Sequence, residues 1–195
     1  MKQHWEPGTM ISPLPALIVT CADGKGHSNL FTASWTGIVC SEPAMCYVSI
    51  RPERHSHGII KESMEFALNL TTIDMAKATD WVGVVSGKRE DKWKGSGLTP
   101  IPAKIIQAPL IAESPISLEC RVRSIQSLGS HDMFLAEIVN VVVEDSYLNP
   151  ETGKLDLSRA GLLSYAHGEY FGLGEFIGYF GWSVKKGDKP IQQRK

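Results

Sequence analysis

The sequence has little net charge, no long apolar run and no paired-cysteine motif, and each absence excludes a class of protein. Its 195 residues include 20 Lys and Arg against 21 Asp and Glu, for a formal net charge of −1. This balance removes the usual electrostatic basis for binding nucleic acid or an anionic membrane surface. No apolar run approaches the roughly 20 residues of a transmembrane helix, and residues 1–7 lack the apolar core of a secretory signal. We therefore expect a cytoplasmic protein with no nucleic-acid partner and no membrane partner.

The four cysteines follow no metal-binding or redox spacing. Cys21, Cys40, Cys46 and Cys120 lie in apolar, strand-like segments, and no two of them form a C-x-x-C motif. Without a secretory signal, an even number of cysteines does not imply disulfides. Free cysteine behaves as a small buried hydrophobe, so we expect buried free thiols. No metal site is expected, because the histidines that flank Ser56 lack a pattern of further ligands nearby.

Apolar residues, at 43% of the chain, and turn signals predict a mainly β protein with short peripheral helices. Strands are expected at 14–21, 30–40, 45–50, 66–70, 116–123 and 134–143. A short helix is expected near 57–64, and a second at 74–84 with Met75, Ala78, Val82 and Val85 on one face and Thr72 or Asp74 as its cap. We expect a single domain over residues 1–195 with a core at about 12–184, folded as a β-barrel or sandwich of α+β type. Dimerisation would cover its exposed strand edges.

The second half of the chain carries three further patterns. Residues 116–123 alternate strictly between apolar and polar, which predicts one buried and one solvated face, and they should pair as a hairpin with 134–143. The valine-rich end of 134–143 suggests burial on both faces, and Asn149–Lys154 should form a surface turn. Residues 165–182 mix aromatics with glycines and predict an irregular segment that packs on the barrel, on a partner subunit or on a flat ligand. Residues 185–190 are expected to fray.

The most informative segment is Arg51–Ser56. It follows an apolar strand and precedes a helix, for which Ser56 is the expected N-cap. Free backbone N–H groups and the helix dipole favour an anion at such a point, and arginine forks match phosphate oxygens. The alternative is a plain surface ion pair between Arg51 or Arg54 and Glu53.

Several motifs recur in a fixed order along the chain, namely Asn29–Gly37 with Ser41–Pro43, Ser49–Ser56, Gly83–Trp93, His131–Ile138 and Gly174–Trp182. Together they resemble the flavin reductase-like family with an FMN-binding split barrel, in particular its flavoredoxin-like branch. The resemblance covers roughly residues 12–184. It implies a homodimeric split β-barrel of Greek-key type that binds FMN non-covalently near the subunit interface. Family members pass electrons from NADH or NADPH to flavin, or from bound flavin to a redox protein partner.

The resemblance assigns candidate residues to the two ends of FMN. Arg51, Arg54 and Ser56 suit the phosphate, with Ser49 and His55 flanking that loop. Thr32, Ala33, Ser34 and Trp35 suit the ring, because small side chains let a planar heterocycle approach the backbone. Ser86 and Lys92 are candidates for a further polar or phosphate contact.

Each assignment has a structural alternative. Thr32, Ser34 and Thr36 also alternate as a half-exposed strand would, and Trp35 could belong to the core. Residues 88–94 are a charge run typical of a solvated helix face, which would make Ser86 and Lys92 structural.

His131 is the candidate catalytic residue. Beside a flavin it could steer the nicotinamide or stabilise negative charge on the reduced ring, or it could only close a hairpin. Cys40 departs from the polar residue that relatives carry before Ser41–Pro43.

Three functions follow from these residues. The first is an NAD(P)H-dependent flavin reductase, and the second is a flavoredoxin-type carrier that passes electrons between proteins through bound FMN. The third is a redox-inactive ligand-binding barrel. The sequence does not distinguish NADH from NADPH or FMN from FAD. It also leaves open the electron acceptor and whether FMN is a prosthetic group or a substrate.

Overall fold

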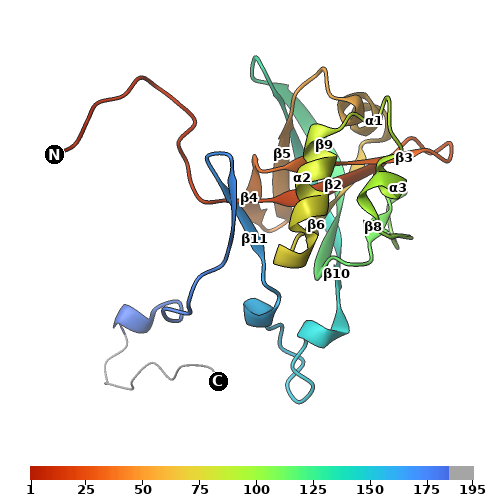
Figure 1. Cartoon of the computed structure of the whole chain (residues 1–195). Helices are drawn as coiled ribbons and strands as arrows, with labels where there is room; N and C mark the ends of the chain where they lie inside the picture. The colour runs from red at the N-terminus through yellow and green to blue at the C-terminus, as the bar shows by residue number, and fades with distance from the viewer. Residues whose placement is uncertain (185–195) are drawn as a thin grey trace.

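The computed structural model describes residues 1–184, and its centre is a seven-stranded antiparallel sheet (Figure 1). The strand order is β3-β2-β6-β9-β10-β5-β4. Their bounds are β2 Leu17–Ala22, β3 Ser28–Ala33, β4 Thr36–Ser41, β5 Ala44–Ile50, β6 Glu65–Leu70, β9 Ile116–Ser127 and β10 Asp132–Val143. The two edge strands, β3 and β4, follow one another in the chain with only Ser34 and Trp35 between them. The two edges of the sheet therefore meet at this corner.

The prediction of one continuous strand over 30–40 was wrong, because the chain bends at this corner. The chain breaks at Ser34 and Trp35, and the Ser49 N–H of β5 donates to the Trp35 carbonyl at 2.9 Å. The expected strand at 14–21 is likewise split, into β1 (Leu14–Pro15) and β2. Periodicity did not reveal either break, because a tertiary bend leaves the local apolar pattern almost unchanged.

The sheet encloses an apolar core. Alternate residues of β5 point inward, so that Cys46, Val48 and Ile50 are buried, and they pack with Phe66 of β6 and Phe134 of β10. Burying a phenylalanine side chain contributes about 1.5–3 kcal/mol. Three of the four free cysteines are buried as expected, whereas Cys40 is partly exposed on β4.

Three short helices lie around the sheet: α1 (His55–Ser63), α2 (Ala76–Val84) and α3 (Lys92–Ser96). Helix α2 packs on β2 and β3 through Met75 and Val82, which confirms the predicted apolar face. A 3₁₀ turn, Ile73–Met75, precedes α2, and Met75 occupies its N-cap position. Thr72 occupies the N-cap position of this 3₁₀ turn, not of α2, and its side chain makes no capping hydrogen bond; the prediction of Asp74 as a cap was wrong.

The predicted hairpin of β9 and β10 is confirmed, with Asp132 opposite Ser127. Two expectations about its faces were wrong. Glu119 is fully buried although it lies on the polar face of β9, because residues 104–106 cover it and donate their backbone N–H groups to its carboxylate. At the valine-rich end of β10, Val141 is 51% and Val142 36% exposed.

The aromatic segment is more regular than expected up to Gly172, whereas residues 173–181 are irregular as predicted. β11 (Leu163–Ala166) and β12 (Glu169–Gly172) form a hairpin that pairs with β1 in a small second sheet. This hairpin stands beside the main sheet, and the first residues of the chain extend away from it (Figure 1). The predicted surface turn Asn149–Lys154 is confirmed.

Smaller elements complete the fold, namely β7 (Pro100–Ile101) with β8 (Leu110–Ile111) and the 3₁₀ turns Asp145–Tyr147, Leu157–Arg159 and Trp182–Val184. Within residues 1–184, no helix combines the length and the apolarity needed to cross a bilayer. The predicted fraying at 185–190 concerns residues outside the described part of the chain.

Candidate functional site

Two adjoining cavities form one groove along β3, between the start of α1 and the end of α2. One has a volume of about 240 Å³ and lies over the loop after β5. The other, of about 320 Å³, lies at the corner between β3 and β4. They share the lining residues Phe31, Thr32, Arg51, Arg54 and Gly83.

The groove brings together every site residue predicted from the sequence. Arg51, Arg54 and Thr32 line both cavities, whereas His55, Ser56, Ser86 and Lys92 line the first and Ala33, Ser34, Trp35, Ser49 and His131 the second. We call the first cavity, over the loop after β5, the cationic end, and the second cavity, at the corner between β3 and β4, the ring end.

At the cationic end, β5 stops at Ile50 and α1 begins at His55. The predicted cap was wrong, because Arg54 occupies the N-cap position and Ser56 is buried in the first turn. The Ser56 hydroxyl accepts a hydrogen bond from Asn29 Nδ2 at 2.7 Å, which ties the helix to β3. Among the described residues no side chain caps α1, so the start of this helix keeps the backbone donors and the positive dipole that favour an anion.

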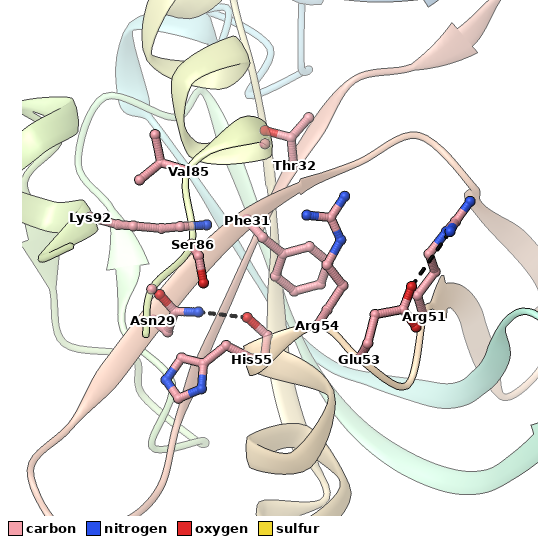
Figure 2. Close-up of a pocket in the computed structure, with 13 residues that line it drawn as sticks. Asn29, Phe31, Thr32, Arg51, Glu53, Arg54, His55, Val85, Ser86 and Lys92 are labelled. Atoms are coloured by element: carbon pink, nitrogen blue, oxygen red, sulfur yellow. Dashed lines mark hydrogen bonds and ion pairs between the residues drawn. The ribbon is translucent and has the colours of Figure 1, made fainter. Parts of the chain in front are cut away.

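The alternative ion pair is also present. Arg51 Nη1 lies 3.5 Å from Glu53 Oε1, and both side chains are exposed, at 54% and 65%. Such an exposed pair contributes little to stability. The Arg54 guanidinium points into the cavity toward Thr32 (Figure 2), so the ion pair of Arg51 does not consume the positive charge of this end.

Lys92 supplies a buried positive charge from the opposite wall. It is 5% exposed, and its Nζ donates to the carbonyls of Leu30 at 2.9 Å and Val82 at 2.6 Å. Burial, and next the nearby charge of Arg54, lower the pKa of Lys92 to about 8. Figure 2 shows its ammonium group reaching into the cavity above Ser86. The alternative interpretation of Lys92 as part of a solvated helix face was therefore wrong.

Two glycines keep this end open. A Cβ on Gly87 would lie 2.3 Å from Asn29 Oδ1, and one on Gly83 would lie 3.1 Å from Thr32 Cβ. Side chains at these positions would press on the residues that line the cavity. The narrow cleft between α2 and β3 thus depends on the absence of side chains there.

The ring end is lined by small side chains and by aromatic ones. Trp35 is 39% exposed and so does not belong to the core, and its ring centroid lies 4.5 Å from that of His131. Burial, followed by the positive charge of Arg51, lowers the pKa of His131, which favours a neutral imidazole. Thr32 is held at the groove wall by the hydrogen bond that its hydroxyl donates to the Thr79 carbonyl.

The lining residues of the ring end that were not predicted include Tyr165, Tyr170 and Asp80. Tyr165 and Tyr170, from the β11–β12 hairpin, lie with ring centroids 5.6 Å apart. Burial and the adjacent carboxylate of Asp80 raise the pKa of Tyr170. The aromatic composition of 165–182 was the available signal, but the hairpin that turns both rings toward the groove is a tertiary feature. Cys40 lines neither cavity, and its thiol donates to the Glu42 carbonyl at 3.3 Å.

Solved structures share this architecture. A flavoredoxin of Desulfovibrio vulgaris (Miyazaki F) is 29% identical, with a TM-score of 0.87 over 95% of this chain and 100% of its own. A split barrel domain structure from Shewanella frigidimarina is 21% identical, with a TM-score of 0.77 over 86% of this chain and 85% of its own. The predicted mainly β, split-barrel fold class is therefore confirmed.

Sequence relatives agree with this result. An uncharacterized protein of Archaeoglobus fulgidus is 32% identical over 148 residues, which are 76% of this chain and 82% of the relative. An NADH:riboflavin 5′-phosphate oxidoreductase of Streptomyces pristinaespiralis is 25% identical over 136 residues, or 67% and 72% of the two chains. The model of the flavin reductase like domain matches residues 10–174. This match spans most of the chain and both ends of the groove, and the protein is therefore a member of the flavin reductase-like family.

Proposed function

We propose that the protein is an oxidoreductase that holds FMN non-covalently in the groove. The observation that carries the proposal is that Arg51 and Arg54 line both adjoining cavities, with Lys92 added in the first and small and aromatic residues in the second. A molecule with a phosphate at one end and a flat ring at the other matches this distribution. The family membership and the flavoredoxin likeness support the same ligand.

The residues of the cationic end fit a phosphate. Arg51 and Arg54 offer guanidinium forks, and Lys92 offers a buried ammonium whose carbonyl partners hold it in place. The uncapped start of α1 adds backbone donors. Ser56, Ser86 and His55 line the same cavity and complete a polar surround.

The residues of the ring end fit a planar heterocycle. Ala33 and Ser34 leave room beside the backbone of the corner, whereas Trp35 and His131 form one wall and Tyr165 and Tyr170 another. When bound, the flavin supplies the two-electron chemistry, which needs no protein acid or base in the strict sense. His131 sits where it can orient a donor or donate a hydrogen bond to the ring, and a lowered pKa favours its neutral form.

We propose NADH or NADPH as the electron donor, on the strength of the relative that is named an NADH:riboflavin 5′-phosphate oxidoreductase. The similarity to flavoredoxin favours a second function, in which the bound flavin passes electrons between protein partners without nicotinamide. A redox-inactive barrel is the third function, and it would not need the combination of cations and aromatic side chains that lines the groove.

One spectroscopic experiment separates these functions. The protein is reconstituted with FMN under argon, and its visible spectrum is recorded before and after addition of NADH and then NADPH. Bleaching of the flavin band by one nucleotide is the expected result. Bound flavin that only dithionite bleaches would establish the carrier, and a protein that binds no FMN would refute both flavin functions.

We also propose a homodimer in the cytoplasm, with a redox protein as a further partner of the carrier function. Ile38 and Val39 are 68% and 51% exposed on β4, which is an edge strand. Apolar edge strands are normally covered, and a second copy would cover this one beside the groove corner. Sedimentation velocity should give twice the mass of 21.4 kDa, and a monomer that still holds FMN would contradict an interface site.

A further inference from the structure

A buried histidine and a largely buried aspartate join two elements of the groove without lining it. His57 lies in the first turn of α1 and Asp132 is the first residue of β10. His57 Nε2 and Asp132 Oδ2 are 2.8 Å apart, with the two side chains 9% and 13% exposed. Neither residue lines the cationic end or the ring end. Any effect of the pair on a ligand is therefore exerted through its neighbours.

Those neighbours belong to opposite ends of the groove. His57 follows Ser56 directly in the turn that starts α1 at the cationic end. Asp132 follows His131, whose ring packs against Trp35 at the ring end. In the sheet, Asp132 also lies opposite Ile50, the residue before Arg51. The contact between His57 and Asp132 thus joins the start of α1, the end of β5 and the residue next to His131.

The surroundings of the pair make it rigid. The His57 ring packs edge-on against buried Phe134, with centroids 5.2 Å apart at 80°. The hydrogen bond from His57 is the main cause that lowers the pKa of Asp132 and keeps it a carboxylate, while its second oxygen, Oδ1, is buried without a hydrogen-bond partner among residues 1–184. A charge-assisted hydrogen bond is stronger than a neutral one, and a poorly solvated carboxylate that loses its donor becomes unfavourable.

We propose that His57 and Asp132 are a positioning pair that fixes the cationic end and the ring end of the groove relative to each other. The inference rests on the proposed function, because it concerns the same flavin. It predicts that losing the pair disturbs both ends together. Loss of a residue that only bound phosphate would disturb one end.

The test compares His57→Ala with the wild type. For each protein, the dissociation constants of FMN and of riboflavin are measured, both with oxidised and with reduced flavin. We expect the dissociation constants of oxidised FMN and riboflavin to rise about tenfold, which corresponds to about 1.4 kcal/mol. The oxidised and reduced forms should weaken unequally, because displacement of His131 changes the surroundings of the reacting ring. That inequality is a shift of the midpoint potential, which a general loosening of the fold would not produce.

His57→Gln retains an N–H donor and should restore the affinities to within about threefold of the wild type. Ser117→Ala is the matched control, since it removes a buried hydrogen bond to Asn69 away from the groove, and it should leave the four affinities unchanged. Should His57→Ala fail to fold, Asp132→Asn replaces it, because the amide preserves the shape and still accepts a bond. It should show the same pattern with dissociation constants about five- to tenfold above those of the wild type, because the neutral amide makes a weaker bond than the carboxylate.

Unchanged affinities, a loss confined to FMN, or an unchanged potential in the folded variant would each overturn the positioning role. Wild-type protein that binds no flavin would instead refute the proposed function, so the two failures are distinct.

Discussion

Replacing Lys92 with methionine removes a buried positive charge from the groove while it preserves the length of the aliphatic stem. In the folded chain the Lys92 ammonium is 5% exposed and donates to two backbone carbonyls. If this cation contacts a phosphate, Lys92→Met should weaken FMN binding and leave riboflavin binding unchanged. Lys94→Met is the matched control, because Lys94 lies on the same helix and is exposed.

The magnitude follows from the surroundings of the ammonium. A hydrogen bond to a charged group is worth about 1.5–3 kcal/mol, so the FMN dissociation constant should rise about 10- to 150-fold. The effect on folding should be smaller. The fall of the Lys92 pKa from 10.5 to about 8 corresponds to a cost of at most about 3 kcal/mol. Methionine relieves that cost but leaves the carbonyls of Leu30 and Val82 without their donor. We therefore expect the free energy of unfolding to change by less than about 1.5 kcal/mol.

The same pKa predicts a pH dependence with a definite sign. Burial lowers the pKa of Lys92 to about 8, so above pH 8 the ligand-free lysine is neutral and must take up a proton to meet a phosphate. The FMN dissociation constant should rise above pH 8 by up to about tenfold per pH unit. Folding stability should itself increase between about pH 8 and 10.5, because the unfolded chain binds more protons there.

Fluorescence titration of FMN and riboflavin from pH 7 to 9.5 measures both effects. The wild type should show the rise for FMN alone, and Lys92→Met should show a flat profile. Equal losses for FMN and riboflavin, or a wild-type affinity that is constant over this range, would refute the phosphate contact of Lys92. An equal loss of FMN affinity in Lys94→Met would show that the effect comes from the lower net positive charge and not from a contact of Lys92.

Three further changes test other parts of the structure. Arg51→Ala combined with Arg54→Ala should weaken FMN binding at least about 100-fold, by two charge-assisted bonds, and weaken riboflavin binding much less in the same titration; equal losses would contradict the assignment. Gly87→Ala should weaken FMN binding and lower the free energy of unfolding by about 1–3 kcal/mol, because its Cβ would lie 2.3 Å from Oδ1 of the buried Asn29, and unaltered affinity would show that the cavity tolerates the methyl group. Glu119→Ala should lower the free energy of unfolding in urea by about 3 kcal/mol, since three backbone N–H groups lose their acceptor, while FMN affinity stays constant. An intact unfolding midpoint in that variant would contradict the burial of its carboxylate.

The periodicity of apolar residues predicted the helices and strands well where one face of the element is buried and the other is exposed. β5, β6 and the β9–β10 hairpin were located within a few residues, because their apolar residues recur with the period of a strand. The apolar face of α2 was located for the same reason, with the helical period. The prediction for Glu119 was wrong, since alternation does not show that a distant loop, residues 104–106, covers the polar face of β9.

The candidate site shows the same division. Arg51, Arg54 and Ser56 could be proposed from the sequence because a strand end, a helix start and paired arginines lie within a few residues. Tyr165 and Tyr170 could not, because they are more than a hundred residues away and reach the groove only through the β11–β12 hairpin.

Residue types and their order along the chain were sufficient to determine the mainly β class, the resemblance to flavin reductases and the residues suited to a phosphate and a ring. These properties depend on side-chain chemistry and local periodicity, which are written in the sequence itself. The three-dimensional fold was required to bury Lys92 and lower its pKa, to expose Trp35 at the corner of the sheet, and to join His57 to Asp132. Solvation and distance between residues far apart in sequence arise only when the chain folds, and local periodicity does not contain them.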